Sequence, residues 1–90
     1  MAGFEVFFSN KAKKFIQKCE PKFRARLREL FLVLGESPVP ASSFDLKKIE
    51  GREDWYRIRL SSYRVQYEVR HESKEIHVMK IERRDEHTYD

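Results

Sequence analysis

The chain of 90 residues has few of the features that mark disulfide-bonded, metal-binding or membrane-spanning proteins. Its one cysteine, Cys19, cannot form an internal disulfide, and its three histidines lack the spacing of a zinc site. No apolar stretch approaches the roughly 20 residues needed to span a bilayer. The N-terminus also lacks the charged start and apolar run of a secretory signal. We therefore expect a cytoplasmic protein with no membrane association, metal or other cofactor.

Charge, by contrast, is abundant in the sequence. Lys and Arg number 19 against 15 Asp and Glu, which gives a formal net charge of +4. A basic chain favours a polyanionic partner such as nucleic acid, an anionic membrane or an acidic protein. The positive excess lies within residues 10–37, because residues 44–90 carry eleven basic and eleven acidic side chains. The length suits one hydrophobic core, so we expect residues 1–90 to form a single domain.

The first half of the chain predicts a strand followed by two helices. Within residues 4–9, aromatic and β-branched residues alternate at a period of two, which is typical of a strand. Ser9 or Asn10 can cap a helix in which apolar residues recur at helical spacing. Pro21 ends this helix and suits the first turn of a second, which ends near Gly35. The two helices are expected to form a hairpin.

Beyond a loop that reaches Ser43, the apolar period changes from helical to alternating. Residues 55–60 and 63–70 predict a β-hairpin with one apolar face. Residues 75–82 predict a third strand, and their apolar spacing leaves no clear polar face, which is typical of an interior strand. The order β-α-α-β-β-β predicts an α+β fold. In this fold the N-terminal strand and helical hairpin pack on one face of a twisted, mainly antiparallel sheet.

The predicted hairpin carries arginines on its other face. Arg57 and Arg59 project from the same side, about 7 Å apart along the strand, and a short turn folds Arg64 back beside them. Three guanidinium groups on one patch repel each other, so this arrangement favours a bound phosphate or carboxylate. The alternative is that the arginines form ordinary ion pairs on a solvated sheet face. The carboxylates considered for such pairs are Glu53, Asp54 and Glu68.

Three segments resemble the core signature of the RelE/ParE toxin superfamily. They are residues 48–51 (KIEG), 55–60 (WYRIRL) and 63–67 (YRVQY). The element order and the basic pair Arg83 and Arg84 shortly before Tyr89 extend the resemblance over nearly the whole chain. It implies a toxin of a type II toxin–antitoxin system. More specifically, it implies an mRNA interferase of the RelE type, a metal-independent endoribonuclease that cuts messenger RNA in the ribosomal A site.

The resemblance also implies roles for individual residues. Arg57 and Arg64 would bind the phosphate while a ribose 2′-OH attacks it, and Arg59 would stabilise the developing charge. Arg83 would neutralise or protonate the leaving 5′-oxygen. Tyr89 would stack on a base or orient the sugar.

This mechanism also needs a general base, which takes the proton of the 2′-OH. Some relatives have lysines at the positions of Arg57 and Arg59, whereas an arginine, with a pKa above about 12, cannot readily accept a proton. His87 is the candidate base, because an unperturbed histidine has a pKa near 6.5 and this one lies two residues from Tyr89. The alternative is that His87 is simply an exposed histidine.

Further basic and aromatic residues are candidates for RNA contacts, because a protein that works on the ribosome needs non-specific phosphate contacts. These candidates are Lys11, Lys14, Lys18, Lys47, Lys48, Arg52, Trp55 and Arg84. For the helical lysines, a solvated helix face is the alternative. The expected partners are the ribosome with its RNA, messenger RNA, and an acidic RelB-like antitoxin that covers or distorts the arginine patch.

Two other functions remain open at this point. One is a ParE-like gyrase inhibitor, which needs the fold but not the phosphate-binding arginines. The other is a catalytically decayed toxin that acts only as an antitoxin partner.

Overall fold

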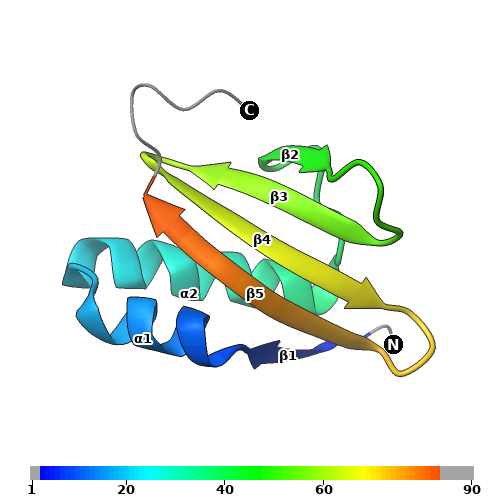
Figure 1. Cartoon of the computed structure of the whole chain (residues 1–90), viewed down its shortest axis with the longest axis horizontal. Coiled ribbons are helices and arrows are strands. Elements are labelled where there is room, and N and C mark those ends of the chain that lie inside the picture. Colours follow the sequence, from blue (N-terminus) through cyan, green and yellow to red (C-terminus); the bar gives the residue numbers. More distant parts are fainter. Residues whose placement is uncertain (1–2, 84–90) are drawn as a thin grey trace.

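The computed structural model describes residues 3–83, which form one sheet and two helices (Figure 1). In chain order the elements are β1 (Glu5–Phe8), α1 (Asn10–Lys18), α2 (Pro21–Glu36), β2 (Asp45–Lys48), β3 (Trp55–Leu60), β4 (Tyr63–Arg70) and β5 (Glu75–Arg83). The predicted order β-α-α-β-β-β is confirmed, with β2 as an additional short strand that the sequence did not reveal. Within the described part of the chain, neither helix has the length and apolar character needed to cross a membrane.

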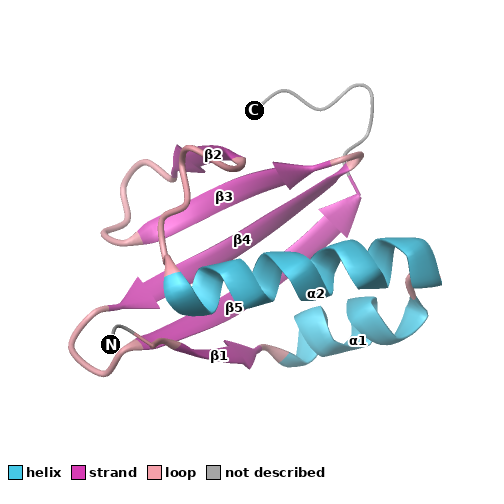
Figure 2. Cartoon of the chain, turned by 180° about the vertical axis from the view of Figure 1, so that it is seen from behind, coloured by secondary structure: helices cyan, strands magenta, loops and turns pink. Residues whose placement is uncertain are grey.

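The five strands form a single mixed sheet in the order β1-β5-β4-β3-β2. Neighbouring strands from β2 to β5 pair antiparallel, whereas β1 joins the edge parallel to β5. Helix α2 lies across one face of the sheet, and α1 runs beside the end of β5 (Figures 1 and 2). As predicted, β5 is an interior strand. The central position belongs to β4.

Capping residues decide where the two helices begin. The Ser9 hydroxyl accepts a hydrogen bond from the backbone N–H of Ala12 at 3.1 Å, as a helix N-cap does. The same hydroxyl donates to the backbone carbonyl of Met79 at 2.7 Å, which ties the start of α1 to β5. Pro21 occupies the first turn of α2, where its fixed φ suits the helix and its missing N–H costs no hydrogen bond.

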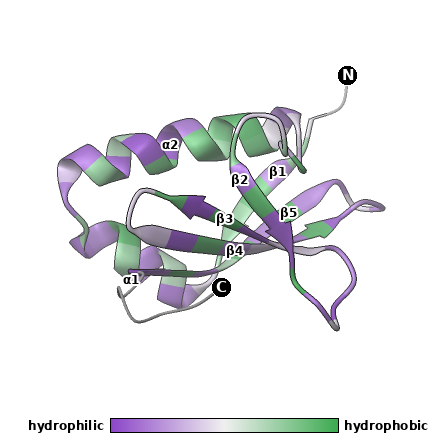
Figure 3. Ribbon diagram, turned by 90° about the horizontal axis from the view of Figure 1, so that it is seen from above, coloured by the Kyte–Doolittle hydropathy of each residue, from purple (hydrophilic) through white to green (hydrophobic). Residues whose placement is uncertain are grey.

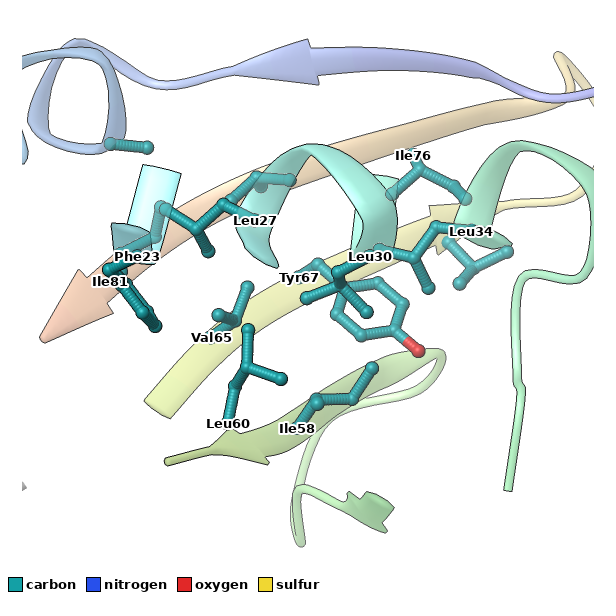
Figure 4. Packing of buried hydrophobic residues seen from close by; sticks show 13 residues of the cluster. Phe23, Leu27, Leu30, Leu34, Ile58, Leu60, Val65, Tyr67, Ile76 and Ile81 are labelled. Atoms are coloured by element: carbon teal, nitrogen blue, oxygen red, sulfur yellow. The ribbon is translucent and has the colours of Figure 1, made fainter. Parts of the chain in front are cut away.

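The hydrophobic core lies between α2 and the sheet (Figure 4). Seen from above, α2 lies on one side of β3 and β4, and its ribbon alternates between hydrophobic and hydrophilic residues (Figure 3). The buried side chains of α2 are Phe23, Leu27, Leu30 and Leu34. They meet a fully buried Tyr67, whose hydroxyl donates to the backbone carbonyl of Pro38 at 2.8 Å. This bond satisfies a polar group that would otherwise be costly to bury.

A β-bulge explains the apolar spacing of β5. Gln66 pairs with Lys80 and Tyr67 pairs with Val78, so Met79 is an extra residue in β5. The apolar side chains of β5 therefore stay on the α2 side before and after the bulge, although their spacing in the sequence changes. The expected absence of a polar face in this strand is wrong. The side chains of β5 that point away from α2 are Glu75, His77, Lys80 and Glu82.

Substitution of two leucines in α2 tests how this helix packs on the sheet. Leu30 is fully buried, whereas Leu32 is 69% exposed. We expect Leu30→Ala to lower the free energy of unfolding by about 2–5 kcal/mol, because it leaves a cavity in the core. Leu32→Ala should change it by less than about 0.5 kcal/mol. Urea denaturation followed by circular dichroism measures both, and equal losses would contradict this packing.

The buried tyrosine predicts how stability depends on alkaline pH. Burial raises the pKa of Tyr67 well above its ordinary value, and nearby Tyr56 acts in the same direction. The folded chain thus holds this proton at pH values where the unfolded chain loses it. Its contribution to stability is fully present below about pH 10 and is lost as the pH rises further. We expect wild-type stability to fall more steeply than that of Tyr67→Phe as the pH rises above about 10. Parallel curves in denaturation experiments would argue against this.

Candidate functional site

The side chains of β2 to β5 that point away from α2 form a surface that we call the arginine face. Cross-strand partners project on the same side of a sheet. Arg57 lies opposite Gln66, and Arg59 lies opposite Arg64. The hairpin thus brings the three arginines onto one face, as the sequence predicted.

One row of side chains across this face has a carboxylate at each end. From β2 to β5 the row consists of Asp45, Arg59, Arg64 and Glu82. Its two arginines are direct cross-strand neighbours, and like charges in that position repel. Asp45 Oδ2 lies 3.6 Å from Arg59 Nη1, and Glu82 Oε1 lies 2.6 Å from Arg64 Nη2. Ion pairs therefore form, but with carboxylates that the sequence analysis did not consider.

The adjacent row adds further positive charge. It consists of Lys47, Arg57, Gln66 and Lys80. Lys80 Nζ lies 3.1 Å from Glu82 Oε2, so the Glu82 carboxylate bridges Lys80 and Arg64. Together the two rows hold five basic and two acidic side chains. Such a surface attracts an anion with several oxygens, such as a phosphate.

The arginines are less exposed than the sequence suggested. Arg57 is only 8% exposed, and the side chain of Arg64 is 17% exposed. Arg59, nearer the edge, reaches 36%. The alternative interpretation of a solvated sheet arginine therefore does not hold for Arg57. The reason is that the unpredicted strand β2 flanks β3 and makes it an interior strand.

Arg83 lies apart from the other three arginines. Its cross-strand partner is Tyr63, whose ring stacks on Phe23 of α2 at 3.9 Å between centroids. Arg83 is therefore an exposed residue at the end of β5 on the α2 side of the sheet. The three remaining predicted site residues, Arg84, His87 and Tyr89, lie outside the described residues.

The predicted RNA-binding residues occupy three different places. Lys47 and Trp55 are on the arginine face, opposite Arg57 and Glu68 respectively. The Arg52 guanidinium stacks over the Trp55 ring, 4.6 Å from its centroid, in a cation–π contact. The other candidates face elsewhere: Lys48 lies opposite Tyr56 on the α2 side, and Lys11, Lys14 and Lys18 are exposed along α1.

His77, to which the sequence analysis gave no role, also points to the arginine face. Its ring stacks on Phe7 at 5.1 Å between centroids, and its Nε2 lies 2.9 Å from Glu75 Oε1. The hydrogen bond from His77 lowers the pKa of the Glu75 carboxyl. His77 lies in the row of Trp55 and Glu68, next to the row of Arg57, and Glu75 lies opposite Arg70, one row further from the three arginines. Across residues 3–83, no group of three His, Cys, Asp or Glu side chains is arranged to hold a metal ion.

The opposite side of the molecule carries an apolar groove of about 790 Å³ between α1, α2 and β1. Its apolar lining includes Phe8, Phe31 and the exposed Leu32. Three basic residues, Lys13, Arg24 and Arg28, and the acidic Glu36 also line it. An apolar groove with basic side chains suits an amphipathic segment that carries acidic residues.

Comparison with known proteins agrees with this architecture. The model of the family described as the ParE toxin of a type II toxin–antitoxin system, parDE, matches residues 6–88. The chain belongs to the RelE/ParE toxin superfamily. It is 32% identical over 82 residues to the putative toxin RelE1 of Methanocaldococcus jannaschii, a match that covers 91% of each sequence.

Solved structures extend the similarity to the fold. The archaeal RelE–RelB complex from Pyrococcus horikoshii contains a chain with a TM-score of 0.85 and 33% identity, over 96% of this chain and 99% of that one. The isolated Escherichia coli RelE toxin gives a TM-score of 0.78 and 26% identity, over 91% and 85%. This protein is thus a RelE-family toxin of a toxin–antitoxin system.

Proposed function

We propose that this toxin is a ribosome-dependent, metal-independent endoribonuclease of the cytoplasm that cuts messenger RNA in the ribosomal A site. The observation that carries the proposal is the arginine face, where guanidinium groups from two adjacent strands gather beside two lysines. When a ribose 2′-OH attacks its own 3′-phosphate, negative charge grows on the phosphorus oxygens and on the leaving 5′-oxygen. Fixed cations lower the energy of such a transition state.

The buried position of Arg57 and Arg64 favours this role. A partly buried cation interacts more strongly with a phosphate than a solvated one, because the surrounding dielectric constant is lower. Arg57 and Arg64 bind the scissile phosphate, and Arg59 adds charge from the same face. Arg83 approaches the leaving oxygen from the end of β5, while Tyr89 stacks on a base and His87 stays a candidate for proton transfer.

The neighbouring nucleotides then follow the basic side chains around this site. Lys47, Trp55 and the stacked Arg52 lie beside the arginines and suit a flanking phosphate and base. Lys48, Arg84 and the lysines of α1 supply contacts to ribosomal RNA that depend on charge and not on sequence.

The decisive test removes one arginine of the site and compares it with a matched arginine of the same strand. Arg64→Ala should slow messenger RNA cleavage by about 100-fold or more, because it removes a cation from the transition state. Arg70→Ala is the control, since Arg70 is on β4 but pairs with Glu68 at 3.0 Å, away from the proposed site. Mapping of messenger RNA ends in a translating extract measures both variants, and equal cleavage by the two would refute the site.

Arg83→Ala tests the leaving-group role separately. Because Arg83 is exposed at the end of β5, its replacement should leave folding intact and abolish toxicity on induced expression. If the Arg64 and Arg83 variants both stayed fully toxic, the proposed site would be wrong.

A gyrase inhibitor is the second candidate function, favoured by the matching family model, which is described for ParE toxins. Induced expression of the toxin distinguishes a gyrase inhibitor from the proposed nuclease. A gyrase inhibitor would leave messages intact and block DNA supercoiling, whereas the proposed nuclease cuts messages only when ribosomes are engaged. A decayed toxin would do neither.

We propose further that a RelB-like, acidic antitoxin is the partner of this toxin, and that an amphipathic segment of it binds the apolar groove. The Pyrococcus relative was solved with its RelB, and the groove offers apolar area with the basic residues Lys13 and Arg28 beside it.

The RelB protein of the Pyrococcus complex is a practical probe for this groove. We expect it to bind the wild-type toxin and to bind Leu32→Glu at least tenfold more weakly, because the glutamate adds negative charge to the groove. Since Leu32 is 69% exposed, the variant should keep its fold. Leu32→Lys is the matched control and should bind acidic RelB more tightly than Leu32→Glu does. Titration calorimetry measures the affinities, and either no wild-type binding or equal affinities would overturn the proposed docking.

A further inference from the structure

We propose that Glu82 is the general base of the cleavage reaction, which deepens the nuclease function proposed above and rests on it. The arginine face brings together cations that can stabilise charge, but an arginine does not accept a proton near neutral pH. A 2′-OH becomes a competent nucleophile only when a group within hydrogen-bonding reach takes its proton. Within residues 3–83, the carboxylate of Glu82 lies 2.6 Å from the partly buried Arg64.

The contacts of Glu82 place it where the base must be. Its Oε1 lies 2.6 Å from Arg64 Nη2, and its Oε2 lies 3.1 Å from Lys80 Nζ. The side chain is 28% exposed, so a substrate can reach it. In RNA the 2′-OH and the 3′-phosphate are carried by the same ribose. A phosphate bound to Arg64 therefore brings its neighbouring 2′-OH close to the Glu82 carboxylate.

The other proton acceptors of the arginine face fit less well. Asp45 is 3.6 Å from Arg59 and its side chain is 60% exposed, so it is held less closely to the phosphate-binding cations. His77 forms a hydrogen bond with Glu75 and stacks on Phe7, in a row that does not contain Arg64. Of these three residues, Glu82 contacts one cation in each row, Arg64 in the first and Lys80 in the second.

Every proton and bond of the proposed step is accounted for by these groups and water. Glu82 takes the proton of the 2′-OH, the 2′-oxygen forms a bond to phosphorus, and the bond from phosphorus to the 5′-oxygen breaks. The 5′-oxygen takes a proton from water, and the proton on Glu82 returns to solvent. The products are a 2′,3′-cyclic phosphate and a 5′-hydroxyl. Arg64 and Lys80 hold both the carboxylate and the phosphate.

The same contacts suggest a competing interpretation, in which Glu82 merely occupies the place of the phosphate. A carboxylate between two cations would then have to be displaced before RNA binds. The two interpretations predict opposite effects of the isosteric change Glu82→Gln, because glutamine keeps an oxygen for Arg64 but neither carries the charge nor accepts the proton. Loss of a base slows cleavage, whereas loss of a competitor speeds it.

The experiment is single-turnover cleavage of messenger RNA on programmed ribosomes, with the toxin in excess. Glu82→Gln should lower the maximal rate by about 100- to 10,000-fold while the half-saturating toxin concentration changes little. Glu75→Gln is the matched control, because Glu75 is also on β5, points to the same face and has a side chain that is 31% exposed. It should cleave at the wild-type rate. An unchanged or increased rate in Glu82→Gln overturns the proposal.

The pH dependence distinguishes Glu82 from a histidine base. A histidine base loses activity as the pH falls through about 6.5, the ordinary pKa of this side chain. If Glu82 is the base, the wild-type maximal rate should stay flat from about pH 6 to 8. A rate that falls with a midpoint near 6.5, and loses this fall in His87→Gln, would assign the base to His87 and overturn the role of Glu82.

The result with the wild-type toxin distinguishes a failure of the proposed nuclease function from a failure of the role proposed for Glu82. Intact messages with wild-type toxin would refute the nuclease function itself. Cleavage by wild type together with equal cleavage by Glu82→Gln would refute only the assignment of the base.

Discussion

The pairing of β5 between β1 and β4 is the constraint on which the proposed site depends. A slip of one residue in a strand moves every side chain to the opposite face of the sheet. The bulge at Met79 shifts the pairing by one residue inside β5. As a result, Lys80 and Glu82 point toward the arginines, while Ile81 stays in the core. The bulge is held from outside the strand, because Ser9 donates a hydrogen bond to the Met79 carbonyl as it caps α1. The start of α1 and the geometry of the arginine face are thus coupled.

Electrostatics explains why so many cations can share this face. Arg59 and Arg64 are direct neighbours across the hairpin, and their repulsion would weaken the sheet if it were not offset. Asp45 and Glu82 offset it from the two ends of the row. The row is therefore compatible with a stable fold before any RNA binds. In the proposed nuclease, a phosphate would then meet guanidinium groups that are already oriented, and such preorganisation lowers the barrier of a reaction that builds charge.

The two sides of the sheet suit different partners. One side presents charged rows with few apolar atoms, which favours a polyanion. The other side presents an apolar groove beside α2, with Leu32 exposed and basic residues along it, which favours an amphipathic protein segment. Because the sheet separates the groove from the arginine face, an antitoxin segment in the groove and an RNA on the arginines would contact different residues. Arg83, at the end of β5 on the α2 side, lies where the two sides meet.

Periodicity by itself determined the order of the elements, the apolar faces of the helices and of the β3–β4 hairpin, and the shared face of Arg57, Arg59 and Arg64, because spacings of two and 3.6 residues are local properties of a sequence. The motifs of the hairpin were also enough to indicate the superfamily. Tertiary structure alone decided the rest: the four-residue strand β2, the bulge at Met79, the burial of Arg57 and the carboxylates that meet the arginines. These features depend on the register in which strands pair, as when β4 and β5 pair so that Arg64 meets Glu82. No local pattern encodes which residue of one strand lies opposite which residue of another.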